Sequence, residues 1–192
     1  MVVVVVGPIG SGKSTVSQAL TKRLRSSGRV VAAIDYDAVV AMIGGFEQLD
    51  TYISRAQTEN SGPASPDWLK TAREAHGRLV GYWSGHGADV VVQGPFASAE
   101  EEDPFLQELS PGVKVRRLRL LVSYEAALKR VLTDERPRNL SRNPAFLRAA
   151  HNHVAAMEPL QREADWTFDT ETLSADEIVA IVEPVLLADV AT

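Results

Sequence analysis

Five consecutive valines, Val2–Val6, lead directly into a glycine-rich stretch near the start of the chain. A run of five residues is too short for a useful helix, and β-branched side chains suit a pleated strand. Because no polar residue alternates with the valines, the pattern predicts a strand that is buried on both faces. Such strands lie at the centre of parallel sheets, so the run predicts an α/β fold.

The residues that follow, Gly7-Pro-Ile-Gly-Ser-Gly-Lys-Ser14, match the phosphate-loop pattern G-x-x-x-x-G-K-[ST]. The glycines let the backbone curve so that successive N–H groups surround an anion, and the next helix adds its unpaired N-terminal donors. Lys13 supplies a point charge for the β- and γ-phosphates, and the Ser14 hydroxyl is a hard oxygen ligand for Mg²⁺. The predicted ATP-binding residues of this stretch are Gly7, Gly10, Ser11, Gly12, Lys13, Ser14 and Thr15.

Bulk properties limit the possible partners of the chain. Its 192 residues predict one domain, 1–192, with a sizeable core, and the absence of cysteine excludes disulfides and thiolate chemistry. A formal net charge of −5 makes nucleic acid an unlikely partner, because duplex binding favours a basic surface. No apolar run reaches membrane-spanning length, so we expect no membrane partner and a cytoplasmic location.

Strand-like and helix-like segments alternate along the rest of the chain. This alternation predicts a doubly wound parallel sheet with helices on both faces, as in the three-layer P-loop NTPase fold. The expected strands are 2–6, 30–34, 88–93, 114–123 and 166–168, and the expected helices begin near 14, 38, 65, 103, 124, 144 and 175. Residues 44–66 are predicted to form an excursion near the substrate site, and His151 and His153 are predicted to lie on the surface.

Further candidates follow the second and third strands, because ligands of open parallel sheets lie beyond the carboxyl ends of the strands. The carboxylates of Asp35 and Asp37 suit two roles there: one can hold a water on Mg²⁺, and the other can accept a proton from a substrate hydroxyl. The alternative for Asp37 is that it caps the next helix. Gly94-Pro95 would let a substrate approach the backbone, or form only a tight turn.

A basic loop carries Arg136, Arg138 and Arg142. Phosphoryl transfer needs positive charge on the equatorial oxygens, which an arginine loop closing over the nucleotide would supply. Arg130, on the preceding helix, is predicted to stack its guanidinium on adenine. The alternative is a solvated loop whose arginines pair with Asp134 and Glu135.

Absent motifs narrow the class of nucleotide-binding protein. The chain has no Asn-Lys-x-Asp to recognise guanine and no Asp-x-x-Gly switch after the third strand, which argues against a GTPase. The third strand ends in Gln93, so it lacks the carboxylate that is usual in motor and transporter ATPases.

In the order of these motifs, the chain resembles the small P-loop kinases of the shikimate kinase, gluconate kinase and chloramphenicol phosphotransferase group. The resemblance rests on 7–15, Asp35-x-Asp37, Gly94-Pro-Phe96 and Arg130 with Arg136. It implies a five-stranded sheet ordered 2-3-1-4-5, a lid at about 133–143 and an adenine-contacting loop near 169–173. It also implies Asp37 as base, Asp35 near Mg²⁺, Arg136 as lid arginine and substrate contacts from Asp35, Asp37, Arg55, Gly94 and Pro95.

The leading hypothesis is therefore an ATP-dependent kinase for the hydroxyl of a small molecule, such as a sugar, a cyclitol or an antibiotic-like compound. A kinase of nucleosides or polynucleotide 5′-hydroxyls is one alternative. A nucleotide-binding regulatory protein without phosphotransfer is the other. The sequence leaves the acceptor and the oligomeric state open.

Overall fold

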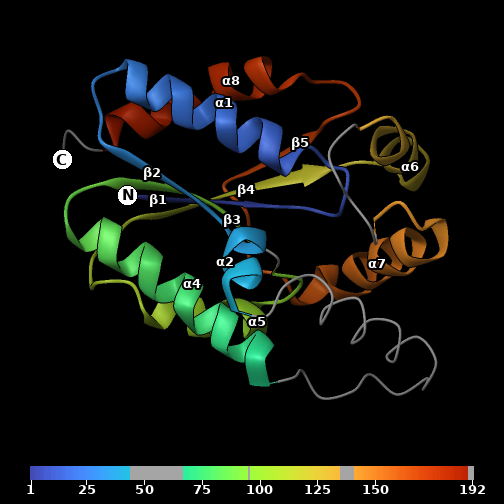
Figure 1. The fold of residues 1–192 in the computed structure, drawn as a ribbon. Helices are drawn as coiled ribbons and strands as arrows, with labels where there is room; N and C mark the ends of the chain where they lie inside the picture. The colour runs from blue at the N-terminus through green and yellow to red at the C-terminus, as the bar shows by residue number, and fades with distance from the viewer. Residues whose placement is uncertain (44–66, 95, 135–140, 190–192) are drawn as a thin grey trace.

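The structure is a computed structural model that describes residues 1–43, 67–94, 96–134 and 141–189. Strands and helices alternate through most of these residues (Figure 1). The strands are β1 (Val2–Val6), β2 (Val31–Asp35), β3 (Asp89–Gln93), β4 (Val115–Leu121) and β5 (Trp166–Asp169). The helices are α1 (Lys13–Ser26), α2 (Tyr36–Ile43), α4 (Asp67–Gly85), α5 (Ala99–Gln107), α6 (Tyr124–Thr133), α7 (Pro144–Met157) and α8 (Ala175–Ala188), and a 3₁₀ turn, η1, spans Glu158–Leu160.

The five strands form one parallel sheet in the order β2-β3-β1-β4-β5, which confirms the predicted fold class and strand order. The valine strand β1 lies at the centre, between β3 and β4, and Val2, Val3, Val4 and Val5 are fully buried. A strand in this position has neighbours on both edges and helices over both faces, which explains its unbroken apolar sequence.

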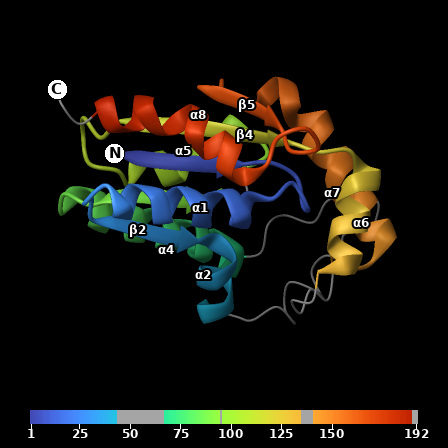
Figure 2. The same cartoon turned by 90° about the horizontal axis from the view of Figure 1, so that it is seen from above.

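Helices cover both faces of the sheet, as Figures 1 and 2 show. Helices α1 and α8 pack on one face, where Leu20 and Ile178 belong to the same buried cluster as Val3 and Val5. Helices α4 and α5 pack on the opposite face, where Val80 and Phe105 join a cluster with Val2 and Val4. The alternation of neighbouring valines between the two clusters follows from the period of two along a strand.

The short helix before β4 differs from its prediction. We expected it to begin at Asp103-Pro104, but α5 starts at Ala99 and Pro104 lies inside it. The start is fixed by Ser98, whose hydroxyl accepts a hydrogen bond from Glu101 N, while the Glu101 carboxylate accepts one from Ala97 N. A serine followed three residues later by glutamate is a helix-start signal, and here it outweighs the proline.

Other helix boundaries agree with their sequence signals. Asn143 caps α7 through its side-chain oxygen, with Pro144 as the first helical residue. Ser174 and Glu177 form a capping box at the start of α8, which agrees with the helix predicted to begin near 175. No helix within the described ranges is both long and apolar enough to cross a bilayer.

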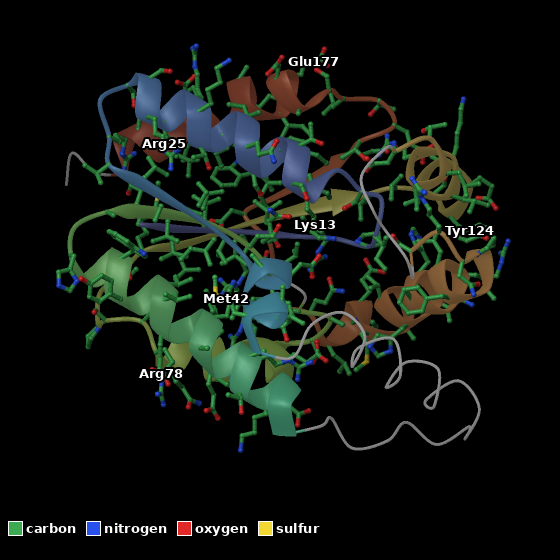
Figure 3. The ribbon with its side chains drawn as sticks, viewed as in Figure 1. Lys13, Arg25, Met42, Arg78, Tyr124 and Glu177 are labelled. Atoms are coloured by element: carbon green, nitrogen blue, oxygen red, sulfur yellow. The ribbon has the colours of Figure 1, made fainter. Side chains whose placement is uncertain are left out.

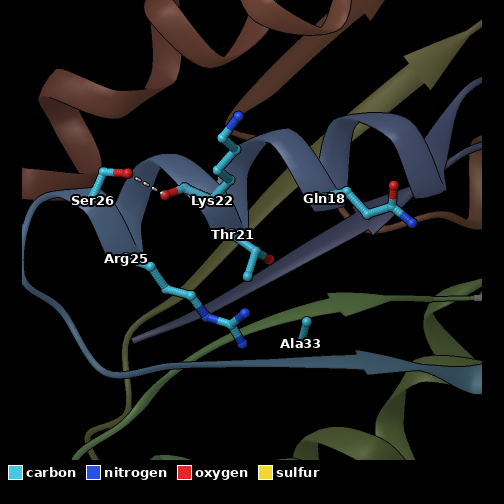
Figure 4. A pocket seen from close by; sticks show the side chains of 6 residues that line it. All are labelled: Gln18, Thr21, Lys22, Arg25, Ser26 and Ala33. Atoms are coloured by element: carbon cyan, nitrogen blue, oxygen red, sulfur yellow. Dashed lines mark hydrogen bonds between the residues drawn. The ribbon is translucent and has the colours of Figure 1, made fainter.

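A cavity of about 470 Å³ lies between α1 and the edge strand β2 (Figure 4). Its walls come from the middle and end of α1, including Thr21 and Arg25, and from Ala33 of β2. Thr21 and Arg25 lie two and three helical turns along α1 from Lys13, which is roughly 12 and 18 Å at 1.5 Å per residue. The cavity therefore does not belong to the predicted phosphate site.

Candidate active site

The glycine-rich turn joins the carboxyl end of β1 to the start of α1, and its three glycines adopt positive φ values. A Cβ on Gly7 would lie 2.5 Å from the Leu120 carbonyl oxygen, and one on Gly10 would lie 2.9 Å from the Ala127 Cβ. Gly12, with φ of 89°, would meet nothing within 4 Å. Packing against β4 and α6 thus requires glycine at 7 and 10, while the chain at Gly12 faces open space that a ligand can approach.

The start of α1 provides the helix-terminal donors that the sequence predicted. Helix α1 begins at Lys13, and the first hydrogen bond back along the chain runs from Val16 N to Gly12 O. The N–H groups that precede Val16 in this turn are those of Lys13, Ser14 and Thr15. Backbone N–H groups at a helix start and the positive end of the helix dipole favour an anion here.

Lys13 reaches back over the turn, as its position at the start of α1 in Figure 3 indicates. Its ammonium donates hydrogen bonds to the carbonyl oxygens of Gly7 at 2.7 Å and Pro8 at 3.0 Å. The charge is thereby held above the first residues of the loop, where the terminal phosphates of a nucleotide would be contacted.

Ser14 is joined to the neighbouring strand β3. Its hydroxyl donates a hydrogen bond of 2.9 Å to Gln93 Oε1, at the last residue of β3. Gln93 is the register partner of Asp35 in β2 and of Val5 in β1. Gln93 therefore contacts both predicted Mg²⁺ residues, Ser14 through the hydrogen bond and Asp35 through strand pairing. From its sequence, Gln93 was notable only because an acidic residue is usual at this strand end.

The two aspartates after β2 have different local roles. Helix α2 begins at Tyr36, and Asp35 Oδ1 accepts a hydrogen bond of 3.0 Å from Asp37 N. The carboxylate that caps the helix is thus that of Asp35, so the alternative of Asp37 as the cap is wrong. Asp37 lies in the first turn with an exposed side chain.

Gly94 is buried directly after β3. A Cβ at this position would lie 2.6 Å from the Phe96 ring, so glycine is explained here by the packing of Phe96. Its predicted contact with a substrate stays a prediction. Pro95, Arg55, Arg136 and Arg138 lie outside the described residues, as do the whole predicted excursion, 44–66, and most of the predicted lid.

A group of buried aromatic side chains near the end of β3 was not predicted from the sequence. His76 of α4 is fully buried, and its ring contacts Tyr36 edge-on at 5.3 Å and Phe105 at 5.5 Å between centroids. Burial lowers the pKa of His76 to about 4, and burial raises the pKa of Tyr36 to about 12 although Arg73 opposes the rise. Among the described residues, neither nitrogen of His76 has a hydrogen-bond partner. The one feature of the sequence that could have indicated this burial is the position of His76 on the apolar side of its helix.

Arg130 of α6 lies where the phosphate loop meets the loop after β5. Its guanidinium donates to Gly10 O at 3.2 Å, Thr170 Oγ1 at 2.9 Å and Thr170 O at 2.6 Å. Thr170 belongs to the predicted adenine-contacting loop at 169–173, so the structure brings Arg130, that loop and the phosphate loop together. Stacking of Arg130 on adenine stays a prediction. Arg142 donates a hydrogen bond to the Asp134 carbonyl oxygen across the predicted lid.

His151 of α7 was predicted to be a surface residue, and this is wrong. Its Nε2 lies 2.9 Å from the carbonyl oxygen of Ile9 in the phosphate loop, and its side chain is half-buried. His153, two residues further along α7, is exposed as predicted. The two side chains point in different directions because residues two apart on a helix are about 200° apart.

A second cavity, of about 390 Å³, adjoins the phosphate loop. It is lined by Gly7 and Pro8 of the loop, Phe96, Arg119 of β4 and residues of α7 that include His151. Neither Asp35 nor Asp37 lines it. The cavity thus lies beside the central strands β1 and β4, whereas the aspartates follow the edge strand β2.

The oxygen donors near the loop fit Mg²⁺ rather than a metal held wholly by protein side chains. In the described part of the chain, no three histidine or acidic side chains gather into a metal-binding cluster. Mg²⁺ is commonly bound by one or two protein oxygens together with phosphate oxygens and water. The Ser14 hydroxyl and the Asp35 carboxylate, beside Gln93, form a donor set of that kind.

The central strand, the glycine-rich turn and the helix that begins at Lys13 define a P-loop protein, and a P-loop domain implies nucleotide binding. The chain belongs to the AAA domain family, whose model matches residues 2–160. A comparison with curated proteins finds no match.

Solved structures with the same fold include enzymes named as kinases. A shikimate kinase from Acinetobacter baumannii, in complex with shikimate, is 20% identical with a TM-score of 0.60, over 100% of this chain and 95% of that one. A sugar kinase from Janibacter sp. HTCC2649 is 18% identical with a TM-score of 0.64, over 96% and 93% of the two chains. A gluconokinase from Sinorhizobium meliloti 1021 is 18% identical with a TM-score of 0.59, over 98% and 96%. At these identities the likeness establishes the fold.

Proposed function

We propose that this protein is an ATP-dependent phosphotransferase that moves the γ-phosphate to a hydroxyl group of a small molecule. The proposal rests mainly on one arrangement: Gln93 accepts a hydrogen bond from Ser14 of the phosphate loop and is the strand partner of Asp35, and Asp37 follows Asp35 by two residues. A phosphate loop alone binds nucleotide. A pair of carboxylates beside it adds groups for a metal and for an acceptor proton.

In the proposed reaction, the acceptor oxygen forms a bond to the γ-phosphorus while the bond between that phosphorus and the β–γ bridging oxygen breaks. The loop N–H groups and Lys13 hold the phosphates, and Arg136 stabilises the charge that spreads over the transferred group. Asp37 takes the proton of the acceptor hydroxyl as the new bond forms. ADP and the phosphorylated acceptor are the products.

Ser14 and Asp35 are the residues that would hold Mg²⁺, Asp35 through a bound water. The ion supplies charge neutralisation on the β- and γ-phosphates. Gln93 Oε1 accepts a hydrogen bond from the Ser14 hydroxyl, so the lone pairs of the serine oxygen can face the metal.

Kinases of small molecules recur among the structures that share this fold, by the names they carry. This recurrence supports a small acceptor, and the formal charge of −5 supports it over a nucleic acid. The identity of the acceptor is not implied by either observation.

A coupled assay for ADP release, run against a panel of sugars, cyclitols, aminocyclitols, nucleosides and a 5′-hydroxyl oligonucleotide, tests the proposal. We expect one group of small hydroxyl compounds to raise ADP release well above the hydrolysis background. Lys13→Ala should abolish that release by several orders of magnitude, whereas Lys22→Ala, exposed on the same helix, should leave it unchanged.

Calorimetric titration with ATP separates the alternatives. ATP binding without ADP release for any acceptor would favour a nucleotide-binding regulatory protein and overturn the kinase proposal. ADP release that is stimulated only by the nucleosides or the oligonucleotide would show that the acceptor is one of those compounds.

A further inference from the structure

Two consecutive carbonyl groups of the phosphate loop are held from outside the loop by side chains of different helices. His151 of α7 contacts Ile9 O at 2.9 Å, and Arg130 of α6 donates to Gly10 O at 3.2 Å. Because a carbonyl oxygen only accepts, the His151 nitrogen at this contact is the protonated one and acts as donor.

The direction of a carbonyl fixes the direction of an N–H group. Peptide units are planar and trans, so the Ile9 C=O and the Gly10 N–H point to opposite sides of the same plane. Holding the Ile9 oxygen outward against α7 therefore turns the Gly10 N–H toward the other side. In a phosphate loop that other side is the concavity in which N–H groups surround the anion.

The backbone at Gly10 needs a restraint, because glycine is flexible and its position against α6 is tightly packed. Gly10 has φ of 80° and packs so closely on α6 that a Cβ would lie 2.9 Å from Ala127 Cβ. A glycine in this conformation has several accessible backbone states, and its peptide can rotate unless something holds it. The hydrogen bond from His151 provides such a restraint on the preceding peptide.

His151 is itself held in place by the beginning of α6. The Tyr124 ring lies edge-on to the His151 ring with centroids 5.9 Å apart, and the Arg148 guanidinium carbon lies 3.8 Å above the same tyrosine ring. The Tyr124 hydroxyl also donates to Pro144 O at 3.2 Å, at the first residue of α7 (Figure 3 labels Tyr124). The contacts join the two helices on either side of the predicted lid at 133–143 and fix the imidazole against the loop.

We propose that His151 is a positioning residue that holds the Ile9–Gly10 peptide in the orientation required by the β-phosphate of a bound nucleotide. It acts through the loop backbone and does not touch the reacting atoms. The proposal rests on the nucleotide-binding part of the proposed function and is independent of the acceptor.

Binding of ADP and AMP, measured by calorimetry, tests the proposal because only ADP carries a β-phosphate. In His151→Phe the ring remains and the donor is lost, so ADP binding should weaken by roughly five- to tenfold, as expected for one hydrogen bond. AMP binding should change by less than twofold. His153→Phe, on the exposed side of the same helix, should leave both affinities unchanged.

Two further variants complete the test, one that keeps a hydrogen-bond donor at position 151 and one that removes the whole ring. The side-chain amide of glutamine can place a donor near the position of Nε2, so His151→Gln should recover most of the ADP affinity. His151→Ala should repeat the ADP-selective loss if the phenylalanine variant does not fold. Equal losses for ADP and AMP, or an ADP affinity within twofold of the wild type in the removal variant, would overturn the proposal.

The outcome is separable from that of the proposed function. A protein that shows the ADP-selective loss but phosphorylates no acceptor would retain the role of His151 and lose the kinase assignment. An active kinase whose ADP affinity does not depend on His151 would retain the kinase assignment and lose the proposed role of His151.

Discussion

The hydroxyl of Ser14 donates a hydrogen bond of 2.9 Å to Gln93 Oε1, and this contact joins the start of α1 to the end of β3. The glutamine stands where a carboxylate is usual in other P-loop ATPases. A neutral amide oxygen can orient the serine hydroxyl, but it adds no negative charge to the metal site. The affinity for Mg²⁺ should therefore depend in part on how well this neutral contact orients the Ser14 hydroxyl.

Changing Gln93 should alter the Mg²⁺ requirement. Gln93→Leu removes the acceptor, so the Mg²⁺ concentration for half-maximal activity should rise roughly tenfold or more, as for other partners of metal ligands. Gln93→Glu should lower it, because a carboxylate accepts the hydrogen bond more strongly and attracts the cation. A Mg²⁺ titration of ADP release measures both effects. Gln18→Leu, exposed on α1, is the control, and equal Mg²⁺ curves for all variants would contradict the prediction.

The two aspartates after β2 should affect different properties, because Asp35 caps α2 beside the proposed Mg²⁺ site and Asp37 is the proposed base. Because Asp35 Oδ1 caps α2, Asp35→Ala should lower the free energy of unfolding by about 1 kcal/mol, whereas Asp35→Asn should retain most of the stability. Asp37→Asn should leave the melting temperature nearly unchanged and lower turnover by about 10²–10⁴-fold, the usual effect of removing a general base. Turnover of Asp37→Asn within a few-fold of the wild type would show that the base lies elsewhere.

The two arginines near the predicted lid should affect different kinetic constants. Arg130 contacts the phosphate loop and Thr170, so Arg130→Ala should mainly raise the KM for ATP. If Arg136 stabilises charge that grows only in the transition state, Arg136→Ala should mainly lower kcat. Steady-state kinetics with varied ATP distinguish the two, with Arg78→Ala on the exposed side of α4 as a control. The same change in both constants for both variants would mean that the loop is wrongly assigned.

His76 should make the protein less stable in mild acid. Its pKa is about 4 in the folded protein against 6.5 as the ordinary value, so between these pH values the unfolded chain binds the extra proton. The free energy of unfolding should therefore be unaffected above pH 6.5 and fall as the pH drops toward 4, by up to about 3 kcal/mol from this group.

Urea unfolding at pH 7 and pH 4.5 measures this loss. His76→Phe keeps an aromatic ring against Tyr36 and Phe105 and removes the titrating group, so it should reduce the difference between the two pH values by about 2–3 kcal/mol. The exposed His153→Phe should not reduce it. Equal acid sensitivity in both variants would show that His76 is not the cause.

Local signals in the sequence predicted most of the fold. The valine run, the alternation of strands and helices, and the helix caps at Asn143 and Ser174 agree with the structure, because each depends on residues close together in the chain. The start of α5 was misjudged because two local signals compete there, and the Ser98–Glu101 capping interactions outweigh Pro104. The order 2-3-1-4-5 came from family resemblance rather than from any single segment.

The chemistry of the phosphate loop is determined by the sequence itself, since its glycines, Lys13 and Ser14 lie close together along the chain and glycine permits the positive φ values of the turn. Only the tertiary structure decided which side chains surround that loop. Gln93 lies 79 residues from Ser14, and His151 lies 142 residues from Ile9. Contacts over such separations depend on which strands are neighbours and on how each helix is rotated about its axis. Both are set by the packing of the whole core, and no local pattern encodes them.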